Sequence, residues 1–347
     1  MRVDNIPEVL SLRCPVCRGT LVSDSDKNLR CLACAEAVRV IGGVPVFPIR
    51  LDQMEAVVSS IRASHEYNFH ASPDDHLKYT KHTLKVYKIL RSIILNNYAR
   101  APKRIKVLDI GAGRGELCSL LSNEFEASMT DVDLYSCLLA KRNQRPDNEF
   151  LVFCSECSYL PLEDCSIDIV IVKETLHHLT NPHMLLCEVV RVLNPGGTAI
   201  IIEPVLGLLR NRSKAESLDA MREFGAIHQH LRLRELSETL RHSFERVRAA
   251  RSVINMTSRI LRKIGISLFS LDMFKNSISS LPIRLGNLIT SMLGGSIIMV
   301  CQVPRLHNAG VPPSELGPYP IELASYLPLP GWLEKAIYDQ LAHSDTR

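Results

Sequence analysis

The sequence predicts an α/β fold with a doubly wound, mostly parallel sheet, preceded by a small cysteine-rich module. Three observations support this prediction. Apolar strands and helices alternate between residues 105 and 204 in units of about thirty residues. The first of these strands leads into a turn with three glycines at alternate positions. Two Cys-x-x-Cys pairs lie nearer the amino terminus.

The elements of the predicted sheet follow one another in a regular order. An apolar strand at 105–110 is followed, after the glycine turn, by a helix from about residue 116. Four further strands are expected at 127–130, 150–153, 166–172 and 198–202. A helix at 182–193 and a turn at 194–197 precede the last of them. A helix at 233–242 and two strands at 244–251 and 296–303 complete the series.

The glycine turn points to a bound ligand. Gly111, Gly113 and Gly115 allow the backbone to bend sharply or to lie against a ligand. The G-x-G-x-G spacing differs from the G-x-G-x-x-G of dinucleotide sites, and the lysine of a P-loop is missing. Asp109 ends the preceding strand, and a carboxylate there would repel a pyrophosphate and suit a cation. The other interpretation of the loop is an ordinary strand-to-helix turn.

Carboxylates also follow the next two strands. Asp133 is the first candidate for accepting hydrogen bonds from two ribose hydroxyls, and Asp131 is the second. Glu156 follows the third strand. Because the carboxyl ends of parallel strands share one edge of the sheet, these groups are expected on the same side as the glycine turn.

With these residues in hand, the block 107–204 resembles the class I S-adenosylmethionine-dependent methyltransferases. The likeness is strongest to the small-molecule type typified by ubiquinone-biosynthesis methyltransferases. It rests on the following segments, which match in order and spacing: Asp109-Ile110-Gly111-Ala112-Gly113-Arg114-Gly115, Asp133, Leu160-Pro161, Ser166-Ile167-Asp168, Leu176-His177-His178-Leu179 and Leu193-Asn194-Pro195-Gly196-Gly197. The resemblance implies a Rossmann-like, seven-stranded sheet whose last strand is antiparallel.

The resemblance also implies a cofactor, S-adenosyl-L-methionine, and the residues around it. The loop residues Gly111, Ala112, Gly113 and Gly115, together with Asp109, would surround the methionine end, and Asp133 would hold the ribose. Glu156 stands where many relatives carry an adenine-contacting aspartate, and its side chain is longer. Lys173 lies between cofactor and acceptor in relatives; an exposed ion pair with Glu174 is the other interpretation.

Catalysis by such an enzyme mainly requires that a nucleophile be aligned with an already electrophilic methyl group. A general base is needed only when the acceptor must lose a proton. The candidates are His177, just past the fourth strand, Glu203, at the end of the fifth, and His230, ahead of a helix that borders the acceptor in this family. For each of them a structural role is the alternative.

The four amino-terminal cysteines have the spacing of a tetrahedral Zn²⁺ site: Cys14, Cys17, Cys31 and Cys34. Fewer than about fifty residues bury little core, and a metal ion would compensate. Four thiolates would fill the coordination shell, so the metal is expected to be structural. The segment 12–47 resembles the zinc-ribbon activator subunit of tRNA and release-factor methyltransferases.

These observations predict a division of the chain. It comprises a zinc-ribbon-like domain (1–50), a helical cover or linker (51–104) with helices at 52–69 and 76–98, a methyltransferase domain (105–303) with a helical insertion before the last strand (253–295), and a proline-rich arm (304–347). The insertion is basic and amphipathic at 254–293. It could form a lid over the acceptor, a membrane-surface patch, a partner face or a buried helical pair.

The composition narrows the function classes. Net charge is +4, and neither a signal-peptide core nor a membrane-spanning run is found, so a cytoplasmic protein is expected. Aromatic residues make up 5% of the chain, and the Asp/Asn-Pro-Pro-aromatic motif of base-modifying enzymes is absent after the fourth strand. Basic residues would still suit an anionic substrate, nucleic acid included.

The predicted function is therefore methyl transfer to an oxygen or nitrogen of a small-molecule, glycoside or lipid-linked acceptor. The first alternative is RNA or protein methylation in which the zinc ribbon docks the substrate. The second is a non-catalytic scaffold that retains the fold.

Overall fold

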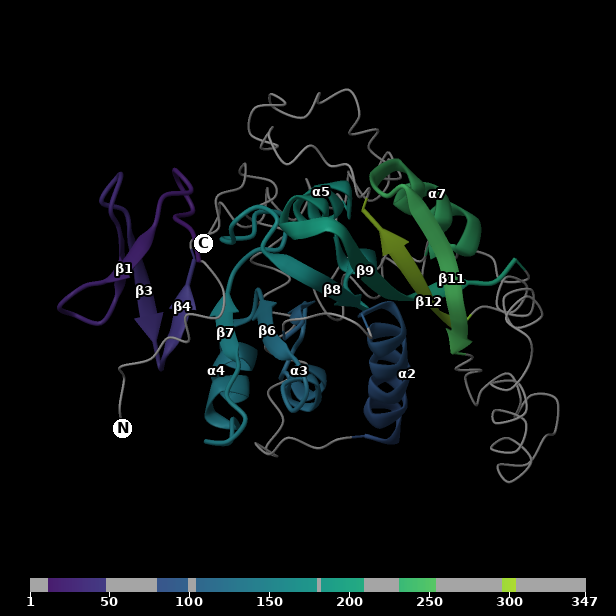
Figure 1. Cartoon of the computed structure of the whole chain (residues 1–347), viewed down its shortest axis with the longest axis horizontal. Helices are drawn as coiled ribbons and strands as arrows, with labels where there is room; N and C mark the ends of the chain where they lie inside the picture. Colours follow the sequence, from purple (N-terminus) through teal and green to yellow (C-terminus); the bar gives the residue numbers. More distant parts are fainter. Residues whose placement is uncertain are drawn as a thin grey trace, which may run out of the picture.

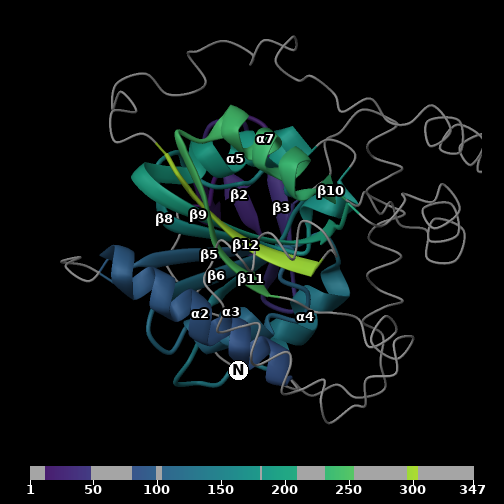
Figure 2. The same cartoon turned by 90° about the vertical axis from the view of Figure 1, so that its right-hand side faces the viewer.

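The computed structural model describes residues 12–47, 80–98, 104–179, 182–208, 231–253 and 295–303. Within these residues one sheet runs through the whole molecule, with helices on both of its faces (Figure 1, Figure 2). The predicted helix at 52–69, most of the predicted insertion and the proline-rich arm lie outside the described residues.

The central part of this sheet is the predicted doubly wound unit. Its strands are β5 (Lys106–Ile110), β6 (Glu126–Asp131), β7 (Leu151–Cys154), β8 (Ile167–Lys173), β9 (Leu193–Leu206), β11 (Arg246–Val253) and β12 (Gly295–Gln302). They are ordered β7-β6-β5-β8-β9-β12-β11, and β12 is antiparallel to both neighbours. The predicted seven strands with an antiparallel last strand are confirmed. The strand order reverses between β5 and β8, where ligands bind in such sheets.

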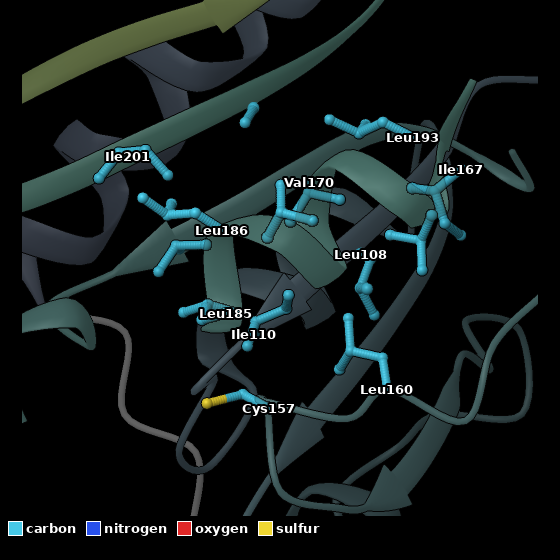
Figure 3. Close-up of a cluster of buried hydrophobic side chains, with 14 of the residues drawn as sticks. Leu108, Ile110, Cys157, Leu160, Ile167, Val170, Leu185, Leu186, Leu193 and Ile201 are labelled. Carbon is cyan, nitrogen blue, oxygen red and sulfur yellow. The ribbon is translucent and has the colours of Figure 1, made fainter. Parts of the chain in front are cut away.

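Helices cover both faces of this unit. On one face lie α2 (Lys81–Tyr98), α3 (Glu116–Leu121) and α4 (Leu134–Arg142), and on the other α5 (Pro182–Val192) and α7 (Leu233–Ser243) (Figure 2). Leu185 and Leu186 of α5 pack on Val170 and Ile201 of the sheet (Figure 3). All four are fully buried, and each such side chain contributes about 1.5–3 kcal/mol.

Two elements differ most from the sequence prediction. The helix expected from residue 76 begins at Lys81, because the hydroxyl of Thr80 accepts the N–H of Thr83 (3.0 Å) and caps the first turn. The expected strand at 198–202 is longer, from Leu193 to Leu206. Here Ile167 pairs with Leu193 and Ile169 with Thr198, so residues 194–197 form an irregularity within β9 rather than a turn before it.

At its carboxyl end β9 continues past Glu203 because two other strands pair with it. Leu231–Arg232 forms the short strand β10, parallel to residues 205–206, and Gly295 of β12 pairs with Val205. Pro204 lacks an N–H, yet it is accommodated opposite Ser296.

The cysteine-rich module joins the sheet. Strands β1 (Leu21–Ser23) and β2 (Leu29–Cys31) form an antiparallel hairpin between the two Cys-x-x-Cys pairs. Strands β3 (Ala37–Ile41) and β4 (Val44–Val46) were not predicted, although Gly42 and Gly43 are typical of a two-residue turn with positive φ (57° and 80°).

Strand β4 lies parallel to β7, with Val46 opposite Cys154 (Figure 1). The N–H of Phe47 donates to the carbonyl of Cys154 (2.9 Å), and the Phe47 ring packs edge-on against Phe153. The module is therefore an extension of the central sheet and not a separate appendage. Among the helices of the described residues, none has the length and apolar character needed to span a bilayer.

Candidate functional site

The glycine turn adopts a conformation that requires glycine. Gly111, Gly113 and Gly115 have φ angles of 68°, 55° and 74°. A Cβ added to Gly111 would overlap the side chain of Thr175, whose Cγ2 would lie 2.9 Å away. A Cβ on Gly115 would lie 2.7 Å from Sδ of Met129. The turn between β5 and α3 therefore packs closely against Thr175, just past the end of β8.

Asp131 fastens this turn to the neighbouring strand. Its Oδ2 accepts the N–H of Gly113 (2.8 Å), and its Oδ1 accepts the N–H of Asp133 (3.0 Å). The sequence left Asp131 as the second ribose candidate. Its role in shaping the loop depends on the pairing of β5 with β6, which no local pattern reveals.

Asp133, the first ribose candidate, caps α4. Its carboxylate accepts the N–H groups of Tyr135 (3.2 Å) and Ser136 (2.9 Å), one on each oxygen. A carboxylate has about four acceptor positions, so one on each oxygen remains for further donors. This geometry is compatible with a pair of adjacent hydroxyls.

Of the four carboxyl groups near the glycine turn, Asp109, Asp131, Asp133 and Glu156, that of Asp109 is the most deeply buried. Burial raises its pKa to about 7, with Asp131 and Glu116 acting in the same direction and Lys173 opposing them. The Lys173 ammonium lies 3.1 Å from the carboxylate of Glu174. A cation bound beside the loop would favour the ionised form of Asp109.

Glu156 lies just past the end of β7 and is buried. Its Oε1 accepts the hydroxyl of Ser158 (3.2 Å) and, at longer range, the N–H of the same residue (3.4 Å). The side chain therefore folds over its own loop at the edge of the sheet where the glycine turn also lies.

Two of the predicted catalytic residues form one buried unit. Oε1 of Glu203 accepts the N–H groups of Thr175 (2.8 Å) and Leu176 (2.7 Å), and Oε2 lies 2.7 Å from Nδ1 of His177. The ring of His178 stacks on His177 with centroids 4.0 Å apart. A carboxylate on one ring nitrogen sets the tautomer and orientation of a histidine. The third candidate, His230, lies outside the described residues.

The segment that carries this unit is strained. Glu174 has a positive φ of 53°, and its N–H donates to the carbonyl of Ile202 (2.7 Å). Positive φ is unfavourable for a residue with a Cβ and is concentrated at functional sites. The sequence carries no signal for it.

The four amino-terminal cysteines come together. All four sulfurs lie within 4.8 Å of one another. The N–H groups of Val16 and Ala33 each donate to a cysteine sulfur (3.4 Å), on Cys14 and Cys31. Hydrogen bonding from the Cys34 N–H is the main cause that lowers the pKa of Cys31 to about 6. The donor set and its N–H contacts fit a tetrahedral metal ion bound by thiolates.

Comparison with known proteins agrees with this geometry. Residues 108–201 match the family model described as "Methyltransferase domain". The chain is 32% identical over 114 residues to the ubiquinone/menaquinone biosynthesis C-methyltransferase UbiE of Neisseria meningitidis serogroup B, covering 31% of this chain and 46% of that protein. It is 30% identical over 132 residues to the malonyl-[acyl-carrier protein] O-methyltransferase of Geobacter sulfurreducens, covering 37% and 48%. The chain thus spans about half the length of these curated relatives.

Solved structures give more distant matches. Phosphoethanolamine N-methyltransferase 2 of Haemonchus contortus, in complex with S-adenosyl-L-methionine, has a TM-score of 0.45 and 17% identity, covering 75% of this chain and 62% of that one. A complex of the Trm112 methyltransferase activator of Haloferax volcanii with a methyltransferase has a TM-score of 0.42 and 18% identity, covering 74% and 100%. Residues 108–201 are therefore similar to a methyltransferase domain, and the curated relatives matched over this block are methyltransferases.

Proposed function

We propose that this chain transfers a methyl group from S-adenosyl-L-methionine to an oxygen or nitrogen of a small-molecule, glycoside or lipid-linked acceptor. The observation that carries the proposal is the glycine turn held by Asp131 beside the buried Asp109, at the point where the strand order reverses. A cationic ligand is favoured there because a carboxylate stands where a phosphate-binding loop would present only donors.

The residues of the loop fit the cofactor. Gly111, Ala112, Gly113 and Gly115 would lie against its methionine end beside Asp109. Asp133 would accept the ribose hydroxyls through its two remaining acceptor positions, and Glu156 would face the adenine. Lys173 would lie between the cofactor and the acceptor. When bound, the cofactor supplies an electrophilic methyl group, so the protein needs to align the acceptor and remove its proton.

His177 is the proposed general base. Glu203 orients its ring and would stabilise the imidazolium that forms when an acceptor hydroxyl or ammonium loses a proton. His230 is a second candidate from the sequence alone. The relatives include a C-methyltransferase and an O-methyltransferase, and a histidine base is needed most for an oxygen acceptor.

We also propose that Cys14, Cys17, Cys31 and Cys34 hold a structural Zn²⁺. A Cys₄ set leaves no open coordination position, so the ion would stabilise the ribbon without taking part in methyl transfer. The N–H donations to Cys14 and Cys31 support thiolate sulfurs at this site.

A second candidate function is methylation of a protein that docks on the ribbon. Val16 and Leu32 lie in the two Cys-x-x-Cys segments and are 43% and 69% exposed. Exposed apolar side chains on a small rigid module are typical of protein contacts.

Calorimetric titration with S-adenosyl-L-methionine tests the cofactor assignment. Binding is expected for the wild type and should weaken by at least about tenfold in Asp133→Ala, because two hydroxyl contacts are lost. Asp147→Ala is a matched control, since this aspartate is exposed and lies ahead of β7, away from the carboxyl ends of the strands. Absence of heat with folded wild-type protein would rule out the proposal.

Acceptor class is tested by supplying labelled cofactor with hydroxylated, amino and lipid-linked compounds and with proteins. Label in a small molecule at oxygen or nitrogen supports the first function. Label at carbon, or only in a protein, would replace it. His177→Ala should abolish transfer while cofactor binding remains.

A further inference from the structure

The two cysteine knuckles of the ribbon share one backbone geometry but differ in one side chain. Arg18 and Ala35 both follow a second cysteine and have φ angles of 60° and 59°. Their N–H groups donate to the carbonyls of Cys14 (3.0 Å) and Cys31 (3.1 Å). Glycine is the residue that suits this conformation best. The first knuckle nevertheless carries the largest basic side chain there.

The Arg18 side chain reaches from the ribbon to the loop that follows β7. Its guanidinium carbon lies 3.8 Å from the centroid of the Tyr159 ring, a cation–π geometry. It donates a hydrogen bond to the carbonyl of Leu160 and lies 3.5 Å from Glu188 of α5. One residue of a knuckle thus touches both the loop and the helix beneath it.

This loop begins at Glu156, the residue proposed to face the adenine. The carbonyl of Glu156 accepts the N–H of Tyr159 (3.3 Å), and the buried N–H of Leu160 donates to Oε2 of Glu188 (2.7 Å). The Leu160 carbonyl also accepts a bond from Arg191 of α5 (2.9 Å). The same carbonyl therefore receives two guanidinium groups, one from α5 and one from the ribbon.

Arg191 belongs to α5, and its other contacts hold the loop on the side of this helix. It is buried, bonds the carbonyl of Leu162 (2.8 Å) and pairs with Asp164 (2.6 Å) and Glu188 (2.7 Å). Among the described ribbon residues, Arg18 is the one that stacks on Tyr159, while the N–H of Arg13 donates to the carbonyl of Pro161 (2.9 Å). The position of the segment from Glu156 to Leu160 thus depends on the ribbon as well as on the sheet.

We propose that Arg18 is a positioning residue that couples the metal-binding knuckle to the adenine side of the cofactor site. This inference rests on the proposed cofactor function. The knuckle holds the Arg18 backbone, and Arg18 holds Tyr159 and Leu160, so the Glu156 loop is ordered before the cofactor arrives. Loss of the metal or of the guanidinium would weaken cofactor binding without changing any group that touches the methyl donor.

The test uses the full chain and the variant Arg18→Gly. Glycine suits the φ of 60°, so the knuckle and its metal content are expected to be preserved. Cofactor dissociation constant and KM should rise by roughly 2- to 30-fold, with kcat unchanged. Arg18→Lys, which keeps the charge but not the planar stacking group, should recover part of this loss.

Two controls separate coupling from general damage. Arg30→Ala alters an arginine that pairs with Asp24 inside the ribbon and should leave cofactor binding unchanged. Tyr159→Leu removes the stacking surface without altering the knuckle and should weaken cofactor binding as Arg18→Gly does. If Arg18→Gly loses metal, Tyr159→Leu decides the question.

Hydrogen exchange in cofactor-free protein tests the coupling even if the cofactor assignment is wrong. Residues 156–162 should exchange faster in Arg18→Gly and Tyr159→Leu than in the wild type and Arg30→Ala. Failure of the wild type to bind cofactor would end the proposed function alone. Unchanged exchange and unchanged affinity in both variants would overturn the role of Arg18.

Discussion

The ribbon and the methyltransferase unit share one sheet but are stabilised by different means. The central strands are buried on both faces by two apolar layers, one under α5 and α7 and one under α2, α3 and α4. The ribbon contributes only a few fully buried apolar residues, Val38 and Val44 among them. Its internal contacts also include the four clustered sulfurs. Strands of one hydrogen-bonded sheet can therefore be stabilised by different kinds of contact in different regions.

The largest expected effect is the unfolding of the ribbon while the central sheet stays folded. Chelation of the metal, or Cys31→Ser, should unfold the ribbon because little apolar core remains to hold it. Limited proteolysis should then cut within residues 12–47 while the central sheet persists. Cys165→Ser, an exposed cysteine outside the cluster, serves as the control. A ribbon that stays resistant after metal removal would contradict the comparison.

The next effect lies on the sheet side. Gly111→Val should abolish cofactor binding and lower the free energy of unfolding by about 3 kcal/mol, because φ is positive and Thr175 occupies the space of a side chain. Gly43→Ala in the ribbon turn has positive φ but meets only the flexible end of Lys141. It should cost about 1 kcal/mol and leave cofactor binding intact. Titration calorimetry and denaturant unfolding measure both.

Glu203→Gln should have an intermediate effect. The amide oxygen still accepts the Thr175 and Leu176 N–H groups, but the charge beside His177 is lost. Unfolding free energy should fall by about 1.5–3 kcal/mol, and turnover by about 10²-fold if His177 is the base. If turnover falls only as much as the loss of folded protein accounts for, the role of Glu203 is purely structural. The pH profile of turnover distinguishes these outcomes.

The fourth effect is a pH dependence that belongs to the sheet alone. The pKa of Asp109 is raised from 3.8 to about 7, mainly by burial, so the folded protein retains this proton where the unfolded chain has released it. Its contribution to stability is present below pH 3.8 and is lost as pH rises to about 7, with a slope of at most about 1.4 kcal/mol per pH unit.

Asp109→Asn should remove this slope, measured by denaturant unfolding between pH 4 and pH 8. Cofactor affinity should change in the opposite sense and increase as pH rises through 7, since a cation favours the ionised carboxylate. An unchanged slope in the variant would show that another group titrates in this range.

The residue ranges of the central strands could be predicted closely from the sequence. Strands β5 to β8 lie within about one residue of the predicted ranges, because parallel buried strands are short apolar runs bounded by polar turns. The glycine turn and the acidic strand ends were visible for the same reason. The cysteine spacing likewise predicted the sulfur cluster.

What the sequence did not reveal depends on long-range pairing. The addition of β4 to β7 joins residues more than a hundred positions apart, and so does the contact of Arg18 with Leu160. The sequence ranked Asp133 ahead of Asp131 for the ribose, but it did not reveal that Asp131 accepts the Gly113 N–H. The extension of β9 past Pro204 needed its partners β10 and β12.

The parallel contact between β4 and β7 has a consequence for solubility. A β7 strand without β4 would expose the Cys154 carbonyl, which accepts the Phe47 N–H, at the end of an apolar strand, and an unpaired strand edge is a template for self-association. The ribbon shields this border of the sheet. Its removal should therefore cause the remaining protein to aggregate, even under conditions where its own core is stable.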